Sequence, residues 1–246
     1  MIDYLYDGTF DGLLTAIFYG YGEREEVHIY KSQLYAPSFF TSPKTIVTEA
    51  EKADRVYTSI HDKLSTSTLE NVYCAYLSEE EGVETLILNY LKLCYRYTDR
   101  INLAKNNDII RAMDLAVKHV RFEAHRYVGF VRFKEIRPML FYAQIEPDHH
   151  ILPLLIEHFE KRFSDQCFMI HDVKRSEVIV YNQKEIFIQQ LTPHEAEVLL
   201  RTQIDDPFEK LFKAYYTSTT IPERINIKRR NAYMPRRYFK HLVELQ

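Results

Sequence analysis

Two acidic residues near the N-terminus have a spacing that could support binding or catalysis. Asp7 and Asp11 lie four residues apart, beside Gly8 and Gly12, where a strand is expected to end and a helix to begin. Their carboxylates could hold a cation, or the backbone amides there could hold an anion. The simpler alternative is that Asp7 or Thr9 caps the helix and the glycines permit a tight turn. The glycine spacing of a phosphate loop is absent.

The densest group of such side chains lies where a long helix is expected to be followed by a strand. Glu123 and His125 are candidate acid and base groups, because helix and strand ends hold side chains rigidly. Arg126 and Arg132 are candidates for stabilising an oxyanion or a phosphate. His119 and Glu123 lie four residues apart, which suits a metal ion or, more commonly, an ion pair. No metal site is predicted.

Polar residues also gather around two later turns. His149 and His150 are adjacent and therefore point in different directions, which disfavours joint binding of one metal ion. The next helix and hairpin carry charged residues that could contribute to phosphate binding, with a solvated charged turn as the alternative. The phosphate-binding candidates are Arg162, Lys174 and Arg175, and Asp172 belongs to the same polar cluster at the hairpin.

The basic C-terminal segment, residues 222–246, is the most informative feature for function. From Glu223 onward there are seven Lys or Arg and two acids, a net charge of +5, whereas the preceding 222 residues carry -8. Guanidinium groups can take phosphates bidentately and tyrosine rings can stack on bases, so the segment suits single-stranded DNA or an extruded base. The alternative is a solvated helix face with local ion pairs. The candidate phosphate-binding residues here are Arg224, Asn226, Lys228, Arg236, Arg237 and Tyr238.

The amino-acid composition is typical of a globular protein. Its 246 residues, 46% hydrophobic and 14% aromatic, can bury a large core. A leader pattern and a long apolar run are both absent, so we expect a cytoplasmic protein without a membrane segment. The three cysteines are far apart and lack Cys-x-x-Cys spacing, which argues against disulfides, a thiolate zinc site and an iron–sulfur cluster on this chain. No cofactor is predicted here.

The period of apolar residues assigns secondary structure along the chain. Helical spacing predicts helices at 10–18, in a run within 49–127, at 151–163 and from 193 onward. Strand patterns lie at 2–7, 27–30, 45–48, 130–135, 140–145, 168–172, 177–181 and 186–190. This order predicts an α+β fold, with a mixed or antiparallel sheet, helices packed on it and a helical middle segment at about 49–127. We expect a single domain over residues 1–246.

Two helix starts have capping signals. Thr48 is followed three residues later by Glu51, and Thr192 by Pro193 and then Glu195. A hydroxyl followed by a glutamate at this spacing can satisfy the first amides of a helix in both directions. We therefore predict Thr48 and Thr192 as N-caps.

Several of these stretches together resemble a bacterial family of DNA metabolism or repair proteins whose reaction is unknown. The matching stretches are Tyr-Asp-Gly-Thr-Phe-Asp-Gly-Leu-Leu at 6–14, Glu-Ala-His-Arg at 123–126, Gly-Phe-Val-Arg-Phe at 129–133 and Met-Pro-Arg-Arg-Tyr at 234–238. Shorter matches are Ile-Glu-Pro at 145–147, His-Phe at 158–159, Arg-Phe at 162–163, Asp172 and Lys-Arg at 174–175. The resemblance covers nearly the whole chain.

The resemblance implies a role associated with DNA repair. Members of that family occur beside a radical-SAM protein, and some are fused to a uracil-DNA glycosylase domain. The implied partner is this radical-SAM protein, which would carry the iron–sulfur cluster and S-adenosylmethionine. The family often has Trp at positions where this chain has Cys167-Phe168 and Tyr238-Phe239. An aromatic residue remains at both places, so packing or stacking is retained, whereas any role for an indole N–H is not.

Three functions remain open from the sequence. The first is a nucleic-acid-binding protein that presents DNA to the radical-SAM partner. The second is an enzyme acting on a nucleotide or base, with an acid–base site around Asp7, Glu123 and His125. The third is a protein-interaction scaffold without nucleic acid, which the acidic body would also suit.

Overall fold

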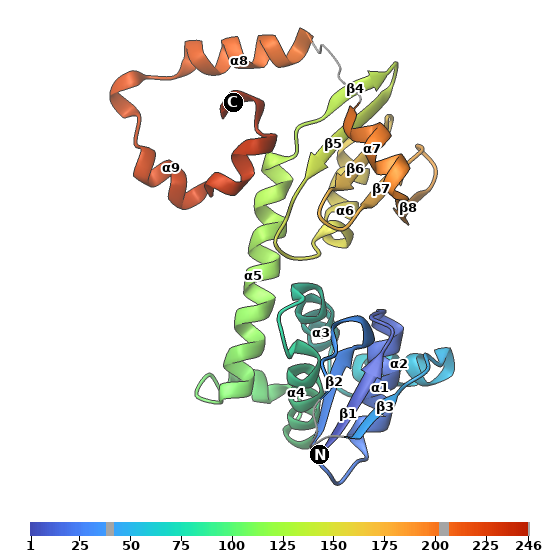
Figure 1. Cartoon of the computed structure of the whole chain (residues 1–246). Coiled ribbons are helices and arrows are strands. Elements are labelled where there is room, and N and C mark those ends of the chain that lie inside the picture. The colour runs from blue at the N-terminus through green and yellow to red at the C-terminus, as the bar shows by residue number, and fades with distance from the viewer. Residues whose placement is uncertain (38–41, 202–206, 246) are drawn as a thin grey trace. The chain divides into compact units, whose positions relative to one another are not determined.

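The computed structural model describes residues 1–37, 42–201 and 207–245, so Gln246 of the basic segment lies outside the described residues. The chain divides into two compact units, Met1–Arg121 and Phe122–Gln246 (Figure 1). Each unit combines a sheet with helices, so the predicted α+β class is confirmed. The single domain over residues 1–246 stays a prediction. In the described ranges, no helix combines the length and the apolar character that crossing a bilayer requires.

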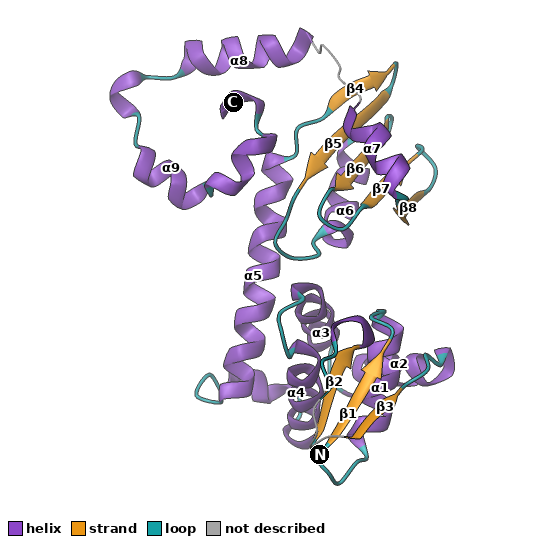
Figure 2. Cartoon of the chain, in the orientation of Figure 1, coloured by secondary structure: helices purple, strands orange, loops and turns teal. Residues whose placement is uncertain are grey.

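The first unit is built on a small parallel sheet (Figure 2). Its strands are ordered β2-β1-β3, and both neighbours of the central strand run parallel to it. The strands are β1 (Ile2–Tyr6), β2 (Val27–Lys31) and β3 (Ser42–Thr45). The helices are α1 (Phe10–Tyr21), α2 (Ala50–Lys63), α3 (Thr66–Ser78) and α4 (Val83–Tyr97), with 3-10 turns η1 (Ser32–Leu34) and η2 (Asp99–Leu103). The predicted helical middle segment is confirmed.

The core of the first unit is formed by aromatic and aliphatic side chains from its central strand and helices. Tyr4 and Tyr6 of β1 are fully buried, as are Leu13 and Leu14 of α1. The Tyr6 hydroxyl donates a hydrogen bond to Oε1 of Glu84, itself a buried residue of α4, at 3.1 Å. Burial of these two polar groups is tolerated because each is the other's hydrogen-bond partner.

The second unit is built on a five-stranded mixed sheet in the order β4-β5-β6-β7-β8. The β5–β6 pair is parallel and the other three pairs are antiparallel. The strands are β4 (Lys134–Arg137), β5 (Leu140–Ile145), β6 (Cys167–Asp172), β7 (Glu177–Tyr181) and β8 (Ile186–Gln190). Because β5 and β6 are parallel, a crossover must join them, and α6 (Leu152–Arg162) supplies it.

Helix α5 (Asp108–Phe130) spans the boundary between the two units, and further helices complete the second one. These are α7 (Pro193–Arg201), α8 (Pro207–Thr219) and α9 (Ile227–Tyr233), with 3-10 turns η3 (Pro222–Arg224), η4 (Arg236–His241) and η5 (Val243–Leu245). The predicted cap at Thr192 is confirmed. Its hydroxyl accepts from the amide of Glu195 at 3.3 Å, and the Glu195 carboxylate accepts from the amide of Thr192 at 2.8 Å.

The predicted strand at 130–135 is wrong over residues 130–133. Helix α5 continues to Phe130, and the amide of Val131 still donates to the carbonyl of Tyr127 at 3.1 Å, so the helical bonding passes Gly129. Strand β4 therefore begins only at Lys134, although its antiparallel hairpin with β5 is as predicted. The alternating apolar and charged residues that indicated a strand therefore lie mostly in the connection between α5 and β4.

The predicted cap at Thr48 is also wrong. Helix α2 begins after Glu49, whose side chain makes no capping hydrogen bond. The hydroxyl of Thr48 donates instead to Oδ2 of Asp7 at 2.7 Å. A contact between residues so far apart in the sequence replaces the local cap that the spacing indicated.

Candidate functional site

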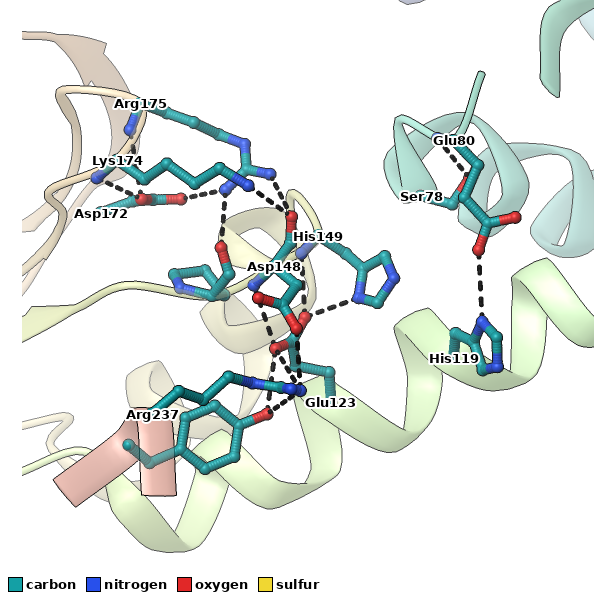
Figure 3. Close-up of polar contacts among 12 residues, drawn as sticks. Ser78, Glu80, His119, Glu123, Asp148, His149, Asp172, Lys174, Arg175 and Arg237 are labelled. Atoms are coloured by element: carbon teal, nitrogen blue, oxygen red, sulfur yellow. Dashed lines mark hydrogen bonds and ion pairs between the residues drawn. The ribbon is translucent and has the colours of Figure 1, made fainter. Parts of the chain in front are cut away.

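Glu123 is the centre of a buried polar network in the second unit (Figure 3). It projects from α5, and its side chain is 3% exposed. Oε2 accepts a hydrogen bond from the amide of His149 at 2.9 Å and lies 2.6 Å from Nδ1 of the same residue. Oε1 accepts from the amide of Asp148 at 3.1 Å and from the hydroxyl of Tyr238 at 3.0 Å. Both carboxylate oxygens are therefore held by the loop after β5 and by the C-terminal segment.

The protonation state of Glu123 follows from these contacts. Burial by itself favours the neutral acid and raises the pKa. Hydrogen bonds from His149, from the backbone of Asp148 and from Tyr238 outweigh burial and lower the pKa of Glu123 to about 2. The carboxylate is ionised at neutral pH and can only accept hydrogen bonds, which assigns a proton to Nδ1 of His149.

The contact between Glu123 and His149 can orient an imidazole for proton transfer. A carboxylate fixed at Nδ1 sets the direction of the ring and makes Nε2 the atom that exchanges a proton. The His149 side chain is 17% exposed and is therefore partly accessible. Because Glu123 is already ionised, it suits the positioning role and not that of a proton donor.

Three basic side chains meet at Asp148, next to Glu123 (Figure 3). Lys174 and Arg175, on the turn after β6, each donate to the backbone oxygen of Asp148 at 2.9 Å. Arg237 approaches from the C-terminal segment and lies 2.9 Å from Oδ2 of Asp148. Arg175 also pairs at 2.9 Å with Asp172, a fully buried acid. These three cations thus connect separate pieces of the second unit.

Asp172, the last residue of β6, is fully buried and holds the turn that follows it. Burial raises its pKa, although the Arg175 guanidinium and the amides of Lys174 and Arg175 favour the charged form. Oδ1 accepts from those two amides, at 3.0 Å and 3.3 Å. The charged turn predicted from the sequence is therefore fixed by hydrogen bonds and belongs to the polar network.

Asp7 and Asp11 lie in the first unit, and the structure gives Asp7 a local structural role. Its Oδ1 accepts from the amide and hydroxyl of Thr9, at 2.9 Å and 2.7 Å. Thr9 in turn caps α1 by accepting from the amide of Gly12, so the alternative considered for this turn is confirmed. A Cβ at Gly12 would clash with Oδ1 of Asp7, which explains why glycine is needed there. These hydrogen bonds lower the pKa of Asp7 against the effect of burial.

Asp11 and His125 are exposed. Asp11 lies in the first turn of α1, and its backbone oxygen accepts from the hydroxyl of Thr15. His125 follows Glu123 by two residues on α5, so the helix turns the two side chains to different sides, one buried and one exposed. The sequence-derived acid–base pair of Glu123 and His125 is therefore not brought together, and His149 occupies that place beside Glu123.

Two predicted arginines near the end of α5 have partners within the second unit. Arg126 lies over the ring of Phe122 at 4.2 Å and donates to the backbone oxygen of Ala232 at 3.4 Å. Arg132 pairs with Glu244 at 2.6 Å, and that carboxylate is itself buried. Arg132 therefore anchors the C-terminal segment to the end of α5.

The predicted phosphate-binding residues of the C-terminal segment divide into two groups. Arg237 belongs to the Glu123 network, and Asn226 caps α9 by accepting from the amide of Arg229 at 2.9 Å. The other group is exposed and forms no ion pair with any acid in the described part of the chain. It consists of Arg224, Lys228 and Arg236, and Arg162 of α6 shares this property.

Tyr238 is buried, with 2% of its surface exposed. Its ring packs against Tyr127 and Phe130, with centroid distances of 4.9 Å and 5.6 Å. Its hydroxyl reaches Glu123. The aromatic residue at this position therefore serves the core and the network, and bases have no access to its ring.

Sequence reasoning missed the contact between Glu123 and His149. Both residues were noted, but His149 was considered only as half of an adjacent histidine pair. The two lie 26 residues apart, and the contact depends on where the loop after β5 meets α5. Spacing along the chain carries no signal of such a contact.

The chain belongs to the DUF4130 family, described as a domain of unknown function, whose model matches residues 81–244. The match includes the whole Glu123 network and the basic C-terminal residues, and it leaves out Asp7 and Asp11. Comparison with curated proteins found no match, and comparison with solved structures found none either.

Proposed function

We propose that this protein binds DNA through the basic C-terminal segment and acts in DNA metabolism or repair together with a radical-SAM partner. The observation that carries the proposal is the set of exposed cations Arg224, Lys228 and Arg236, which form no ion pair with any acid among the described residues. Positive charge that is already paired gains little from a phosphate, because its existing partner must first be displaced. Unpaired cations on a segment of net charge +5 meet no such cost.

The network around Glu123 supports the same proposal indirectly. Arg237 and Tyr238 fix the C-terminal segment to the folded body through Glu123 and Asp148. Arg132 adds a second attachment through Glu244. A segment tied at these points presents its remaining cations from a defined position, and a preorganised surface binds with a smaller loss of entropy.

Binding to labelled DNA across a salt series tests the proposal. The variant carries Arg224→Ala, Lys228→Ala and Arg236→Ala together. If each residue contacts one phosphate, the slope of log affinity against log salt for a single strand should flatten by about 0.7 for each lost contact, or about 2 in total. Loss of affinity should be largest at low salt.

A charge-matched control separates local contacts from the overall field. Lys105→Ala, Arg111→Ala and Lys118→Ala remove the same formal charge from exposed positions in the first unit. This control should bind DNA nearly as the parent does. Equal losses in the two variants, or no binding of the parent at low salt, would contradict the proposal and favour a protein-interaction scaffold.

The radical-SAM partner is tested by co-purification. Tagged protein and the purified radical-SAM protein should associate, and labelled DNA should join the complex only when the basic residues are intact. Association that survives in the triple variant without DNA would mean that the two proteins bind each other directly and that the basic segment serves only the nucleic acid. The absence of any association would remove the partner from the proposal.

A second candidate function is acid–base catalysis on a nucleotide or base, favoured by the 2.6 Å contact between His149 and Glu123. In this function His149 exchanges the proton and Glu123 positions the ring. Asp7, Asp11 and His125 have no such arrangement in the units where they lie.

Adjacent histidines provide a matched pair for testing this candidate. End-labelled DNA with defined base lesions is incubated with the protein, and the products are separated on a gel. His149→Ala and Glu123→Gln should abolish any product that forms. His150→Ala should not, because His150 contacts a different acid, Glu177, at 2.7 Å. Product formation that is retained in both His149→Ala and Glu123→Gln would remove these two residues from the mechanism.

A further inference from the structure

A cavity of about 640 Å³ lies in the second unit, apart from the Glu123 network. It is bordered by the end of α5, the start of β4, the end of α6 and one face of α8. Binding sites for small organic groups have volumes of roughly 300–1,000 Å³ and are lined mainly by apolar and aromatic side chains. The cavity is therefore large enough for a nucleotide.

Aromatic rings line this cavity from two parts of the chain. Phe133 and Phe163, on the side of β4 and α6, are in edge contact at a centroid distance of 4.9 Å. Phe212 and Tyr215 come from α8, where they are 38% and 63% exposed. Exposed rings on one helical face are costly in water unless something covers them.

The charge around the cavity selects the kind of group that would cover these rings. Of its basic residues, Arg132 is paired with Glu244, and Lys134 with Glu209 at 2.8 Å. Arg162 has no acidic partner in the described part of the chain, and its guanidinium lies 5.8 Å from the centroid of Phe163. The cavity therefore joins aromatic faces to a positive charge, that of Arg162, which no described acid compensates.

We propose that this cavity receives one unpaired nucleobase of a bound DNA, with its phosphate held by Arg162. Aromatic faces stack on any base without regard to sequence, and a guanidinium takes a phosphate oxygen bidentately. A neutral apolar helix of a protein partner would cover the rings but would leave the Arg162 charge without a counterpart. The inference rests on the proposed DNA binding and specifies which part of the DNA the second unit holds.

A fluorescent base tests the cavity separately from overall DNA binding. The probe is a DNA duplex with a single unpaired 2-aminopurine, whose emission is quenched when it stacks on an aromatic ring. Binding is followed by anisotropy of a terminal dye, and stacking by the emission of 2-aminopurine. The parent protein should bind the duplex and quench the base. A duplex with an abasic residue at the same position should bind about 5-fold or more weakly, since a stacked base contributes at least this much.

Substitutions on the exposed side of the cavity should not disturb folding. The double variant Phe212→Ala and Tyr215→Ala should lose the quenching, whereas Tyr233→Ala, an exposed tyrosine on α9 outside the cavity, should retain it. Arg162→Ala should weaken binding and reduce the salt slope by about one contact. Lys161→Ala is its matched control, because this neighbouring cation pairs with Glu157 and does not line the cavity.

The two readouts distinguish the possible failures. Anisotropy that reports tight binding while 2-aminopurine keeps its full emission would overturn the cavity assignment and leave the proposed DNA binding in place. Equal affinity for the abasic duplex would do the same. The absence of any anisotropy change at low salt would overturn both. Quenching that disappears only in the cavity variants supports the assignment.

Discussion

The Glu123 network and the stretch from residue 222 to 236 are both rich in charge, but the charges have different surroundings. In the network, Arg175 and Arg237 each contact an acid and a second polar group. In the stretch, Arg224 and Arg236 are exposed and have no acidic partner among the described residues. The same residue type therefore serves the fold in one region and is available to a partner in the other.

This difference shows that a count of basic residues overestimates a nucleic-acid interface. Of the predicted phosphate-binding residues in the C-terminal segment, Arg237, Asn226 and Tyr238 are used inside the protein. Removing such residues would weaken DNA binding by disturbing the fold and not by deleting a contact. A variant meant to test binding should therefore leave them in place.

The largest effect is expected where the network loses its central acid. Glu123→Ala leaves the hydroxyl of Tyr238, Nδ1 of His149 and two backbone amides without their acceptor. It also removes one of the negative charges that lie near Arg237. Breaking a buried charged contact in this way costs about 3–5 kcal/mol. Urea unfolding monitored by circular dichroism measures the loss.

Glu123→Gln is the control for that measurement. It keeps one oxygen as an acceptor and removes the charge, so its loss of stability should be smaller than that of Glu123→Ala. If the free energy of unfolding of Glu123→Ala lies within about 0.5 kcal/mol of that of the parent protein, the network does not stabilise the fold. The contrast between the two regions then fails.

The next effect is a dependence of stability on pH. The pKa of Glu123 is about 2 in the folded protein and lies below its ordinary value of 4.5. The lowered pKa of Glu123 contributes about 3 kcal/mol to the free energy of unfolding. This contribution is fully present above about pH 4.5 and is lost as the pH falls toward 2. Urea midpoints of the parent and of Glu123→Gln, measured between pH 6 and pH 2.5, isolate this residue from other acids. Parallel curves for the two proteins would contradict the lowered pKa.

Much of the fold was predictable because local patterns determine its elements. The apolar stripe of α5, the apolar residues of β6 and the β-branched run of β7 identify these elements directly. The wrong predictions lie at the ends of helices and strands. Thr48 carries a capping signal but bonds to Asp7, 41 residues away, and the end of α5 passes Gly129 because Val131 still reaches Tyr127. Tertiary contacts override local propensity at these positions.

The site was only partly predictable. Glu123 was identified from the density of polar residues around it, and the basic segment from its charge. The contact of Glu123 with His149 and the burial of Tyr238 depend on packing between distant segments. The aromatic cavity likewise joins Phe133 to residues of α8 that follow it by more than 70 positions. No period or spacing in one sequence encodes these encounters.

A smaller effect is expected at Tyr238. Tyr238→Phe keeps the ring contacts with Tyr127 and Phe130. It removes the hydrogen bond that the hydroxyl donates to Glu123 and the one that it accepts from Arg237, so the loss should be about 2 kcal/mol. Thermal unfolding of the parent and the variant measures it. A loss as large as that of Glu123→Ala would mean that the hydroxyl alone holds the C-terminal segment in place.

The smallest effect on stability is expected from the triple variant of the exposed stretch. This variant breaks no ion pair between described residues, because it carries only Arg224→Ala, Lys228→Ala and Arg236→Ala. The free energy of unfolding, measured in urea, should therefore change by no more than about 0.5 kcal/mol for each substitution. The same variant should show the large loss of DNA affinity proposed above. These two results together would separate the binding region from the structural one. If the triple variant is instead destabilised as strongly as Glu123→Ala, its cations serve the fold, and the assignment of this stretch to DNA is lost.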